Sequence, residues 1–182
     1  MSDIQAMELD EEVTPRETEV NMSVYTYPYR WNCWAGFWSN IKQWFDNRKA
    51  AKQRAKRGYC YGDVWECGDS IIDHMIVMLV EYRNKTNGYP ATHFSEFKDW
   101  IAYIDEMIDL LEYSRKDLDK LNDYYPIYDA YLEDRTSPQK TEEWLSVRDR
   151  YFEENERLYI SQKEARKKAL AMFAEYSDAI WW

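Results

Sequence analysis

The stretch from Arg57 to Pro90, RGYCYGDVWECGDSIIDHMIVMLVEYRNKTNGYP, is the most informative part of this chain. Its basic start is followed by Gly58, a typical residue for closing a helix. Asp63 is a strong N-cap candidate for a second helix, and Glu66 three residues later can complete a capping box. An apolar run then extends to Asn87-Gly88, and Pro90 prevents the helix from resuming. The stretch therefore predicts two helices joined by a tight corner.

Apolar residues at spacings of three and four predict the helices of this region and its flanks. The first helix, over about residues 32–57, has an apolar stripe of Trp34, Phe37, Trp38, Ile41, Trp44 and Phe45. The second has a nearly continuous apolar surface of Val64, Ile71, Ile72, Met75, Ile76, Met78, Leu79 and Tyr82, which predicts a central, covered helix. A third, from about Ser95 to Asn122, has the inward face Phe97, Trp100 or Ile101, Ile104, Ile108 and Leu111.

The last predicted helix is long. Pro126 interrupts the preceding pattern, and Ser137-Pro138 is expected to supply the N-cap and first helical residue. Helical spacing then continues from Trp144 to Ile180, which corresponds to roughly 55–60 Å at about 1.5 Å per residue. Because a small bundle cannot cover such a rod, we expect it to protrude, bend or pair with another chain. Asn155 and Gln162, seven residues apart, are placed to fix the register of a homodimer.

The composition supports an all-α fold, a bundle of about four helices with a long C-terminal helix. Only five glycines and five prolines occur among 182 residues, of which 45% are hydrophobic. Residues 1–29 carry seven acidic side chains and one basic side chain, that of Arg16, so we expect a disordered acidic tail. Residues 30–182 are then expected to form a single helical domain.

Charge and hydropathy restrict the function classes. The net charge of −10 argues against general nucleic-acid binding, because phosphate contacts need clustered Lys and Arg side chains. No run of about 18 apolar residues is present, which predicts that the chain does not enter a membrane. Three widely spaced cysteines and an acidic start without a secretory pattern favour reduced thiols in a cytoplasm.

The segments RGYCYGDVW (residues 57–65) and NGYP (residues 87–90), with the apolar helix between them, resemble a family of uncharacterised proteins common in tailed-phage and prophage genomes. The likeness extends over roughly residues 34–182 and includes Phe97 to Trp100 and the closing Ile180-Trp181-Trp182. The resemblance implies a helical protein of the host-cell cytoplasm. It also implies a small phage protein that acts on a host factor or a host signal and has no established catalytic activity.

The residues expected to bind a partner cluster where the first two helices meet. They are Arg54, Lys56, Arg57, Tyr59, Asp63 and Trp65. The segment from Arg30 to Arg57 contains eight Lys or Arg residues and one acid, interleaved with four tryptophans. Such a surface suits stacking and phosphate contacts with a small nucleotide, and it suits an acidic host protein equally well. Contact with the chain's own acidic tail, or a corner that only sets the angle between helices, are the structural alternatives.

An enzymatic alternative rests on two E-x-x-D pairs, Glu66 with Asp69 and Glu106 with Asp109. Carboxylates three residues apart share a helix face, where two helices can hold Mg²⁺ through oxygen ligands. The arrangement resembles that of all-helical nucleotide pyrophosphatases of the MazG type, which implies metal-assisted hydrolysis of a phosphoanhydride. Cys60, Cys67 and His74 are spaced by sevens, but they lack the paired spacing and fourth ligand of a structural zinc site.

Overall fold

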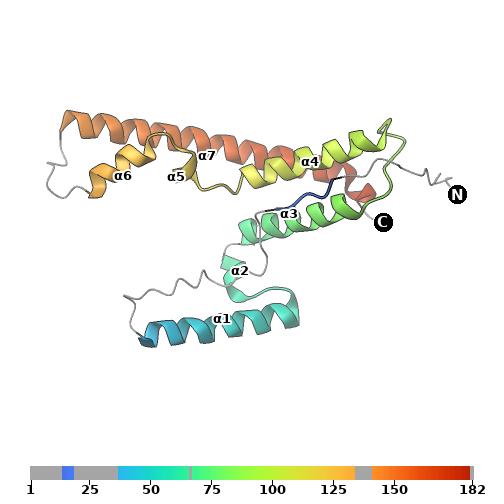
Figure 1. The fold of residues 1–182 in the computed structure, drawn as a ribbon, viewed down its shortest axis with the longest axis horizontal. Coiled ribbons are helices and arrows are strands. Elements are labelled where there is room, and N and C mark those ends of the chain that lie inside the picture. The colour runs from blue at the N-terminus through green and yellow to red at the C-terminus, as the bar shows by residue number, and fades with distance from the viewer. Residues whose placement is uncertain (1–13, 19–36, 66, 134–140, 181–182) are drawn as a thin grey trace. The chain divides into compact units, whose positions relative to one another are not determined.

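The computed structural model describes residues 14–18, 37–65, 67–133 and 141–180. The described residues form helices and no strand, which confirms the all-α prediction and the long C-terminal helix (Figure 1). None of these helices is both long and apolar enough to span a bilayer. The chain divides into two compact units, Met1–Asn87 and Gly88–Trp182. The single domain over residues 30–182 stays a prediction, and most of the expected acidic tail lies outside the described residues.

The first unit contains three helices, α1 (Phe37–Arg57), α2 (Tyr61–Trp65) and α3 (Cys67–Lys85). The short α2 packs against both α1 and α3. The predicted first helix is confirmed from residue 37 onward, and residues 32–36 lie outside the described part. Residues 14–18 have no regular structure and are hydrogen-bonded to the last turn of α3.

The predicted start of the second helix was wrong. Helix α2 begins at Tyr61, two residues before Asp63, and its described residues end at Trp65. Asp63 is the third residue of α2, and its carboxylate accepts a hydrogen bond from the backbone N–H of Cys60 (2.7 Å). That contact is the reverse half of a capping box, in which the third helical residue caps the N–H preceding the helix. The aspartate was therefore recognised as a cap, but at the wrong position in the helix.

Helix α3 is less completely covered than its apolar sequence predicts. Ile72, Ile76, Leu79 and Val80 are buried. Ile71 and Met78 are exposed, at 57% and 69% of their surface. The apolar run therefore contains one buried face and one exposed face, which residue type alone does not distinguish.

The second unit is a long helix with shorter helices laid along it. Helices α4 (Phe97–Tyr113), α5 (Leu118–Leu121) and α6 (Tyr125–Glu133) each contact α7 (Glu142–Tyr176), which is followed by η2 (Ser177–Ala179). Figure 1 shows α4, α5 and α6 following one another along α7. The 35 residues of α7 correspond to about 53 Å. Three successive helices of the same chain therefore cover α7, which was not predicted from the sequence.

The core of the second unit lies between α4 and α7. The predicted inward face of α4 is confirmed, because Trp100, Ile104, Ile108 and Leu111 are fully buried. Opposite them, α7 contributes small and apolar residues, which are Leu158, Ala165, Ala169 and Met172. Small side chains at a helix contact let the two axes approach closely, so the larger α4 side chains fill the interface.

An aromatic cluster joins the start of α4 to the end of α7. The ring of Phe94 lies 5.0 Å from that of Trp100, 5.4 Å from that of Tyr103 and 5.3 Å from that of Tyr176. The Tyr103 hydroxyl donates to the carbonyl of Met172 (3.1 Å). Burial, together with the nearby carboxylate of Glu175, raises the pKa of Tyr103 to about 12. The tyrosine is therefore a neutral donor at physiological pH.

The predicted third helix was wrong in its length, because it stops at Tyr113 instead of continuing to Asn122. The Ser114 hydroxyl donates to the carbonyl of Leu111 (2.7 Å), a local bond that competes with helix continuation. The side-chain amide of Gln162 donates to the carbonyls of Tyr113 (3.1 Å) and Lys116 (2.8 Å). A side chain of α7 therefore satisfies carbonyls that a longer helix would have paired.

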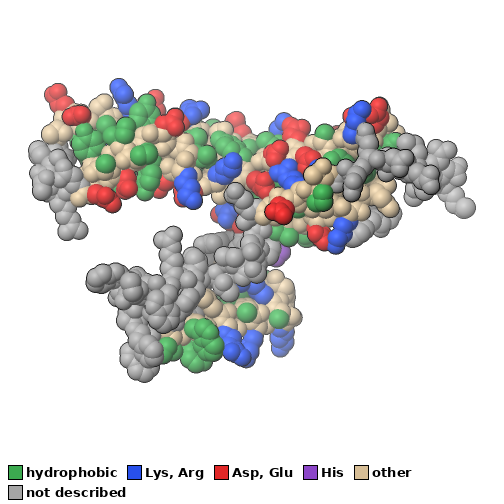
Figure 2. Space-filling view, viewed as in Figure 1, with side chains coloured by type: hydrophobic (Ala, Val, Ile, Leu, Met, Phe, Trp, Pro, Cys, Tyr) green, Lys and Arg blue, Asp and Glu red, His purple; other side chains and the backbone are tan. Residues whose placement is uncertain are grey.

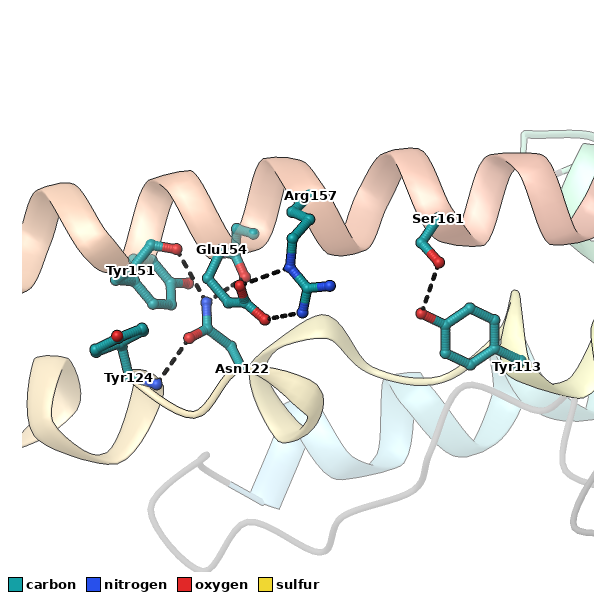
Figure 3. Close-up of polar contacts among 8 residues, drawn as sticks. Tyr113, Asn122, Tyr124, Tyr151, Glu154, Arg157 and Ser161 are labelled. Atoms are coloured by element: carbon teal, nitrogen blue, oxygen red, sulfur yellow. Dashed lines mark hydrogen bonds and ion pairs between the residues drawn. The ribbon is translucent and has the colours of Figure 1, made fainter.

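Asn122 links α5 and α6 to α7 (Figure 3). Its side-chain nitrogen donates to the Tyr151 carbonyl (2.9 Å) and to the Asn155 carboxamide oxygen (2.8 Å). Its own oxygen accepts from the backbone N–H of Tyr124 (2.8 Å). Asn155 and Gln162 thus both bond within their own chain, and their spacing gives no reason to invoke a second chain. The homodimer stays a prediction.

The beginning of α7 also differs from the sequence-based expectation. Its N-cap is Thr141, whose hydroxyl accepts from the N–H of Trp144 (3.2 Å), and residue 141 is not helical. Ser137 and Pro138, the expected start, lie outside the described residues. Pro126 is the second residue of α6, in a first turn where its missing N–H is tolerated.

Candidate functional site

The candidate site is the corner between α1 and α2, and Gly58 makes that corner possible. Gly58 has a φ of +80°, and its N–H donates to the Arg54 carbonyl (2.8 Å). A residue in this left-handed conformation ends a helix and turns the chain, as the sequence predicted. Only two residues then separate Gly58 from the first residue of α2.

A buried ion pair holds the two sides of the corner together. Arg54 Nε lies 3.0 Å from Asp63 Oδ2, and Arg54 Nη2 lies 2.6 Å from Asp63 Oδ1. Asp63 Oδ2 also accepts from the Cys60 N–H, so the carboxylate receives three hydrogen bonds. The Asp63 residue is 8% exposed and the Cys60 residue 3%. This bidentate geometry fixes the orientation of α2 relative to the end of α1.

The electrostatics agree with this geometry. Hydrogen bonds from Arg54 hold the pKa of Asp63 at about 2, below the ordinary value of 3.8. The same carboxylate raises the pKa of Arg54. Both groups are therefore charged over the physiological range, and each neutralises the other. Arg54 and Asp63 stabilise the corner, and the neighbouring cations Lys56 and Arg57 are exposed.

Arg57 is the cation that the corner displays. Its guanidinium carbon lies 5.2 Å from the centre of the Tyr59 ring and 4.8 Å from that of the Tyr61 ring. The two tyrosines are 46% and 64% exposed. Tyr61 is held in place by its N–H, which donates to the side-chain oxygen of Gln53 on α1 (3.1 Å). Aromatic faces can hold a guanidinium in one orientation while its N–H groups still reach a ligand.

The exposed face of α1 continues this surface away from the corner. Trp44 and Phe45 are 49% and 60% exposed and contact each other edge to face, with ring centres 4.9 Å apart. The guanidinium of Arg48 lies 5.3 Å from the centre of the Trp44 ring. In Figure 2, Lys and Arg side chains lie beside hydrophobic side chains on α1. We call this basic aromatic surface the α1 face; it comprises Lys42, Trp44, Phe45, Arg48, Lys49, Lys52, Lys56 and Arg57.

The structure gives the six expected binding residues different environments. Arg54 and Asp63 form the ion pair, whereas Lys56, Arg57 and Tyr59 are exposed beside it. Trp65 ends α2, and its side chain lies outside the described part. Among the described residues, no carboxylate pairs with Lys56 or Arg57. The sequence analysis missed Tyr61, although its position two residues after Tyr59, close to Arg57, was a usable signal.

The paired carboxylates of the metal hypothesis do not form a cluster in the described residues. Glu66 lies outside that part of the chain, and Asp69 belongs to α3 of the first unit. Glu106 and Asp109 belong to α4 of the second unit, where Glu106 Oε1 lies 2.6 Å from Lys168 Nζ. No group of three or more His, Cys, Asp or Glu residues able to hold a metal ion occurs among the described residues. The Mg²⁺ hypothesis stays a prediction.

Cys60, Cys67 and His74, which are spaced by seven residues, lie in different environments. Cys60 is buried beside the ion pair, whereas Cys67 is exposed at the start of α3. His74 Nδ1 lies 2.9 Å from the carbonyl oxygen of Ser70, one turn earlier in the same helix. A carbonyl oxygen only accepts, so this ring nitrogen carries the proton.

With the site described, the chain can be compared with known proteins. No protein-family model matches it, and no curated protein or solved structure matches it either.

Proposed function

We propose that this chain is a non-enzymatic binding protein that captures an acidic protein partner on the α1 face. The observation that carries the proposal is that the two arginines at the corner, Arg54 and Arg57, have different environments. Asp63 neutralises Arg54, while Arg57 is exposed between two tyrosine rings. A cation that is oriented but not paired with a described carboxylate is suited to a carboxylate or phosphate from another molecule.

The extent of the surface favours a protein over a small ligand. Helix α1 has 21 residues and is therefore about 30 Å long. Exposed aromatic side chains near one end and exposed basic side chains toward the other can contact an extended partner simultaneously. Tyr, Trp, Phe and Arg are the residues enriched in the centres of protein interfaces. The chain as a whole carries a net charge of −10, and the α1 face is basic. This contrast in charge orients an approaching anionic partner toward the α1 face.

A second candidate ligand is a small nucleotide, and the arrangement around Arg57 supports it. The exposed Tyr59 and Tyr61 rings offer stacking surfaces next to a guanidinium that can contact a phosphate. Such a ligand would use the corner alone. Substitution of Trp44 would then leave binding unchanged, whereas it would weaken binding of a protein that covers the whole α1 face.

The test is a binding titration of the full chain with fluorescent probes followed by anisotropy. An acidic peptide of alternating Glu and Asp represents the protein partner, and a nucleoside triphosphate represents the nucleotide. Arg57→Ala should weaken peptide binding about tenfold, since one charge-assisted contact contributes roughly 1.5 kcal/mol. Trp44→Ala should weaken it as well. Lys163→Ala, which removes an exposed lysine from α7, is the matched control and should have no effect.

Three results contradict parts of the proposal. Equal peptide binding by the wild type and Arg57→Ala removes the corner from recognition. Nucleotide binding that depends on Arg57 but not on Trp44 replaces the protein partner with the nucleotide. Turnover of a nucleotide with Mg²⁺ that is lost in Glu106→Gln and Asp109→Asn would establish the hydrolase alternative.

A further inference from the structure

The last turn of α3 binds an extended segment of the chain by its backbone. The backbone N–H of Arg16 donates to Asn84 Oδ1 (2.8 Å), and Asn84 Nδ2 donates to the Arg16 carbonyl (2.7 Å). One carboxamide thus both accepts from and donates to one peptide residue, as two paired residues do in an antiparallel sheet. Two residues earlier, the Thr14 carbonyl accepts a hydrogen bond from Arg83 Nη1.

The carboxamide is held in the orientation that this pairing needs. Arg83 Nη1 also lies 3.3 Å from Asn84 Oδ1. A guanidinium only donates, so this contact assigns the oxygen of the carboxamide to the position facing the Arg16 N–H. Arg83 and Asn84 are consecutive residues in the last turn of α3, which ends at Lys85. They therefore act as one unit at a fixed point of the helix.

The bound segment is recognised by shape more than by sequence. The contacts from Arg83 and Asn84 described above reach the peptide groups of residues 14 and 16. Pro15 favours an extended backbone at Thr14, which presents its carbonyl to one side. A backbone-directed contact of this kind is the basis of peptide recognition by strand addition, in which main-chain hydrogen bonds provide affinity.

We propose that Arg83 and Asn84 form a docking site for an extended peptide main chain, which residues 14–18 occupy and from which a competing peptide displaces them. The site is separate from the α1 face and does not depend on the function proposed there. The resident segment has the advantage of belonging to the same chain, which gives it a high effective concentration. A peptide added in solution must overcome that advantage, so exchange requires an excess of peptide.

Trypsin provides the first test, because it cleaves after Arg16 and needs an extended, accessible segment. Full-length wild type, Asn84→Ala and the control Asn87→Ala are digested briefly, and release of the fragment ending at Arg16 is followed by mass spectrometry. Asn84→Ala should accelerate this cleavage about tenfold, because two backbone hydrogen bonds no longer protect the segment. Asn87→Ala, three residues further along the chain, should cleave at the wild-type rate. Equal rates for wild type and Asn84→Ala would overturn the proposal.

A second test adds the peptide in solution and varies the peptide first. A fluorescent peptide of residues 11–20 is titrated with the full-length wild type, beside the same peptide carrying Arg16→Pro. The proline lacks the N–H that donates to Asn84 Oδ1, so this peptide should bind at least about fivefold more weakly. Equal affinity of the two peptides, or unchanged binding of the first to Asn84→Ala, would show that the main-chain pairing does not form a docking site.

Discussion

Replacement of Asp63 by Asn removes one charge from the corner, together with one of the two acceptor oxygens that face Arg54. Asn has nearly the same shape, and its amide oxygen can still accept from the Cys60 N–H. What disappears is the attraction to Arg54, whose two nitrogens lie 3.0 Å and 2.6 Å from the carboxylate oxygens. The variant therefore measures how much the bidentate contact with Arg54 contributes to the stability of α2.

The pKa of Asp63 gives the size of this contribution. Its value of about 2 in the folded chain lies about 1.8 below the ordinary value of 3.8. Each pKa unit corresponds to about 1.4 kcal/mol, so the ionised carboxylate stabilises the fold by about 2 kcal/mol. Asp63 is 8% exposed but the Arg54 side chain is 21% exposed, so solvent screening reduces this figure. Asp63→Asn should lower the free energy of opening α2 by the same amount.

Hydrogen exchange of the Cys60 amide measures that opening directly, since this N–H is bonded to Asp63. At pH 7 the amide should exchange about 30-fold faster in Asp63→Asn than in the wild type. The folded-state pKa is the lower one, so the stabilisation is complete above the ordinary value and is lost as pH falls from 3.8 to about 2. The ratio of the two rates should therefore decline toward one over that range.

Asp46→Asn is the matched control, because Asp46 is an exposed carboxylate on α1 and the charge change is identical. It should leave Cys60 exchange unchanged at every pH. A rate ratio below about threefold at pH 7 would mean that the ion pair contributes little to folding. A large ratio that persists at pH 2 would show that the loss arises from altered packing and not from charge.

The remaining predictions concern backbone and core. Gly58→Ala should destabilise the first unit by about 1 kcal/mol in a urea titration, because φ is +80° and the cost is backbone strain; no atom lies within 4 Å of the added methyl group. Gly68→Ala, in α3, is the control and should be neutral or slightly stabilising in the same titration. Gln162→Ala should destabilise the second unit by about 1–3 kcal/mol, because it leaves two carbonyls without their hydrogen bond from Gln162. Hydrogen exchange should become faster only in residues 113–121. Uniformly faster exchange across α7 would contradict that local origin. Trp100→Ala should cost about 3–5 kcal/mol, measured as a fall in thermal midpoint, and a loss below about 1 kcal/mol would mean that the aromatic cluster can close around the cavity.

Local signals were sufficient for much of the fold. The apolar stripe of α4 was correctly placed from periodicity, and the end of α1 followed from a basic last turn and a glycine. These features depend on residues close together in sequence. The six residues expected to bind a partner also lie close together in sequence, between Arg54 and Trp65.

Two of the failures involve a partner that is distant in sequence or a residue whose position in the helix is ambiguous. Helix α4 stops early where Gln162, more than forty residues away, bonds the carbonyls of Tyr113, the last residue of the helix, and of Lys116. Asp63 was recognised as a cap, but the difference between an N-cap and a third helical residue depends on where the backbone turns. The pairing of Arg54 with Asp63 follows from that turn, and the two residue types alone did not predict it.

The serial coverage of α7 has a mechanical consequence. Its first half is held by α5 and α6, and its second half by α4, with different side chains in each seam. Helix α7 therefore has two sections that are held separately: the α6 section, covered by α5 and α6, and the α4 section, covered by α4. The α6 section contains no buried residue of its own, whereas α4 contains seven. A pulling force applied to the two ends of the unit, or a rise in temperature, would therefore open the α6 section first and leave the α4 section closed. The second unit would then lengthen at the α6 end while the core between α4 and α7 stays packed.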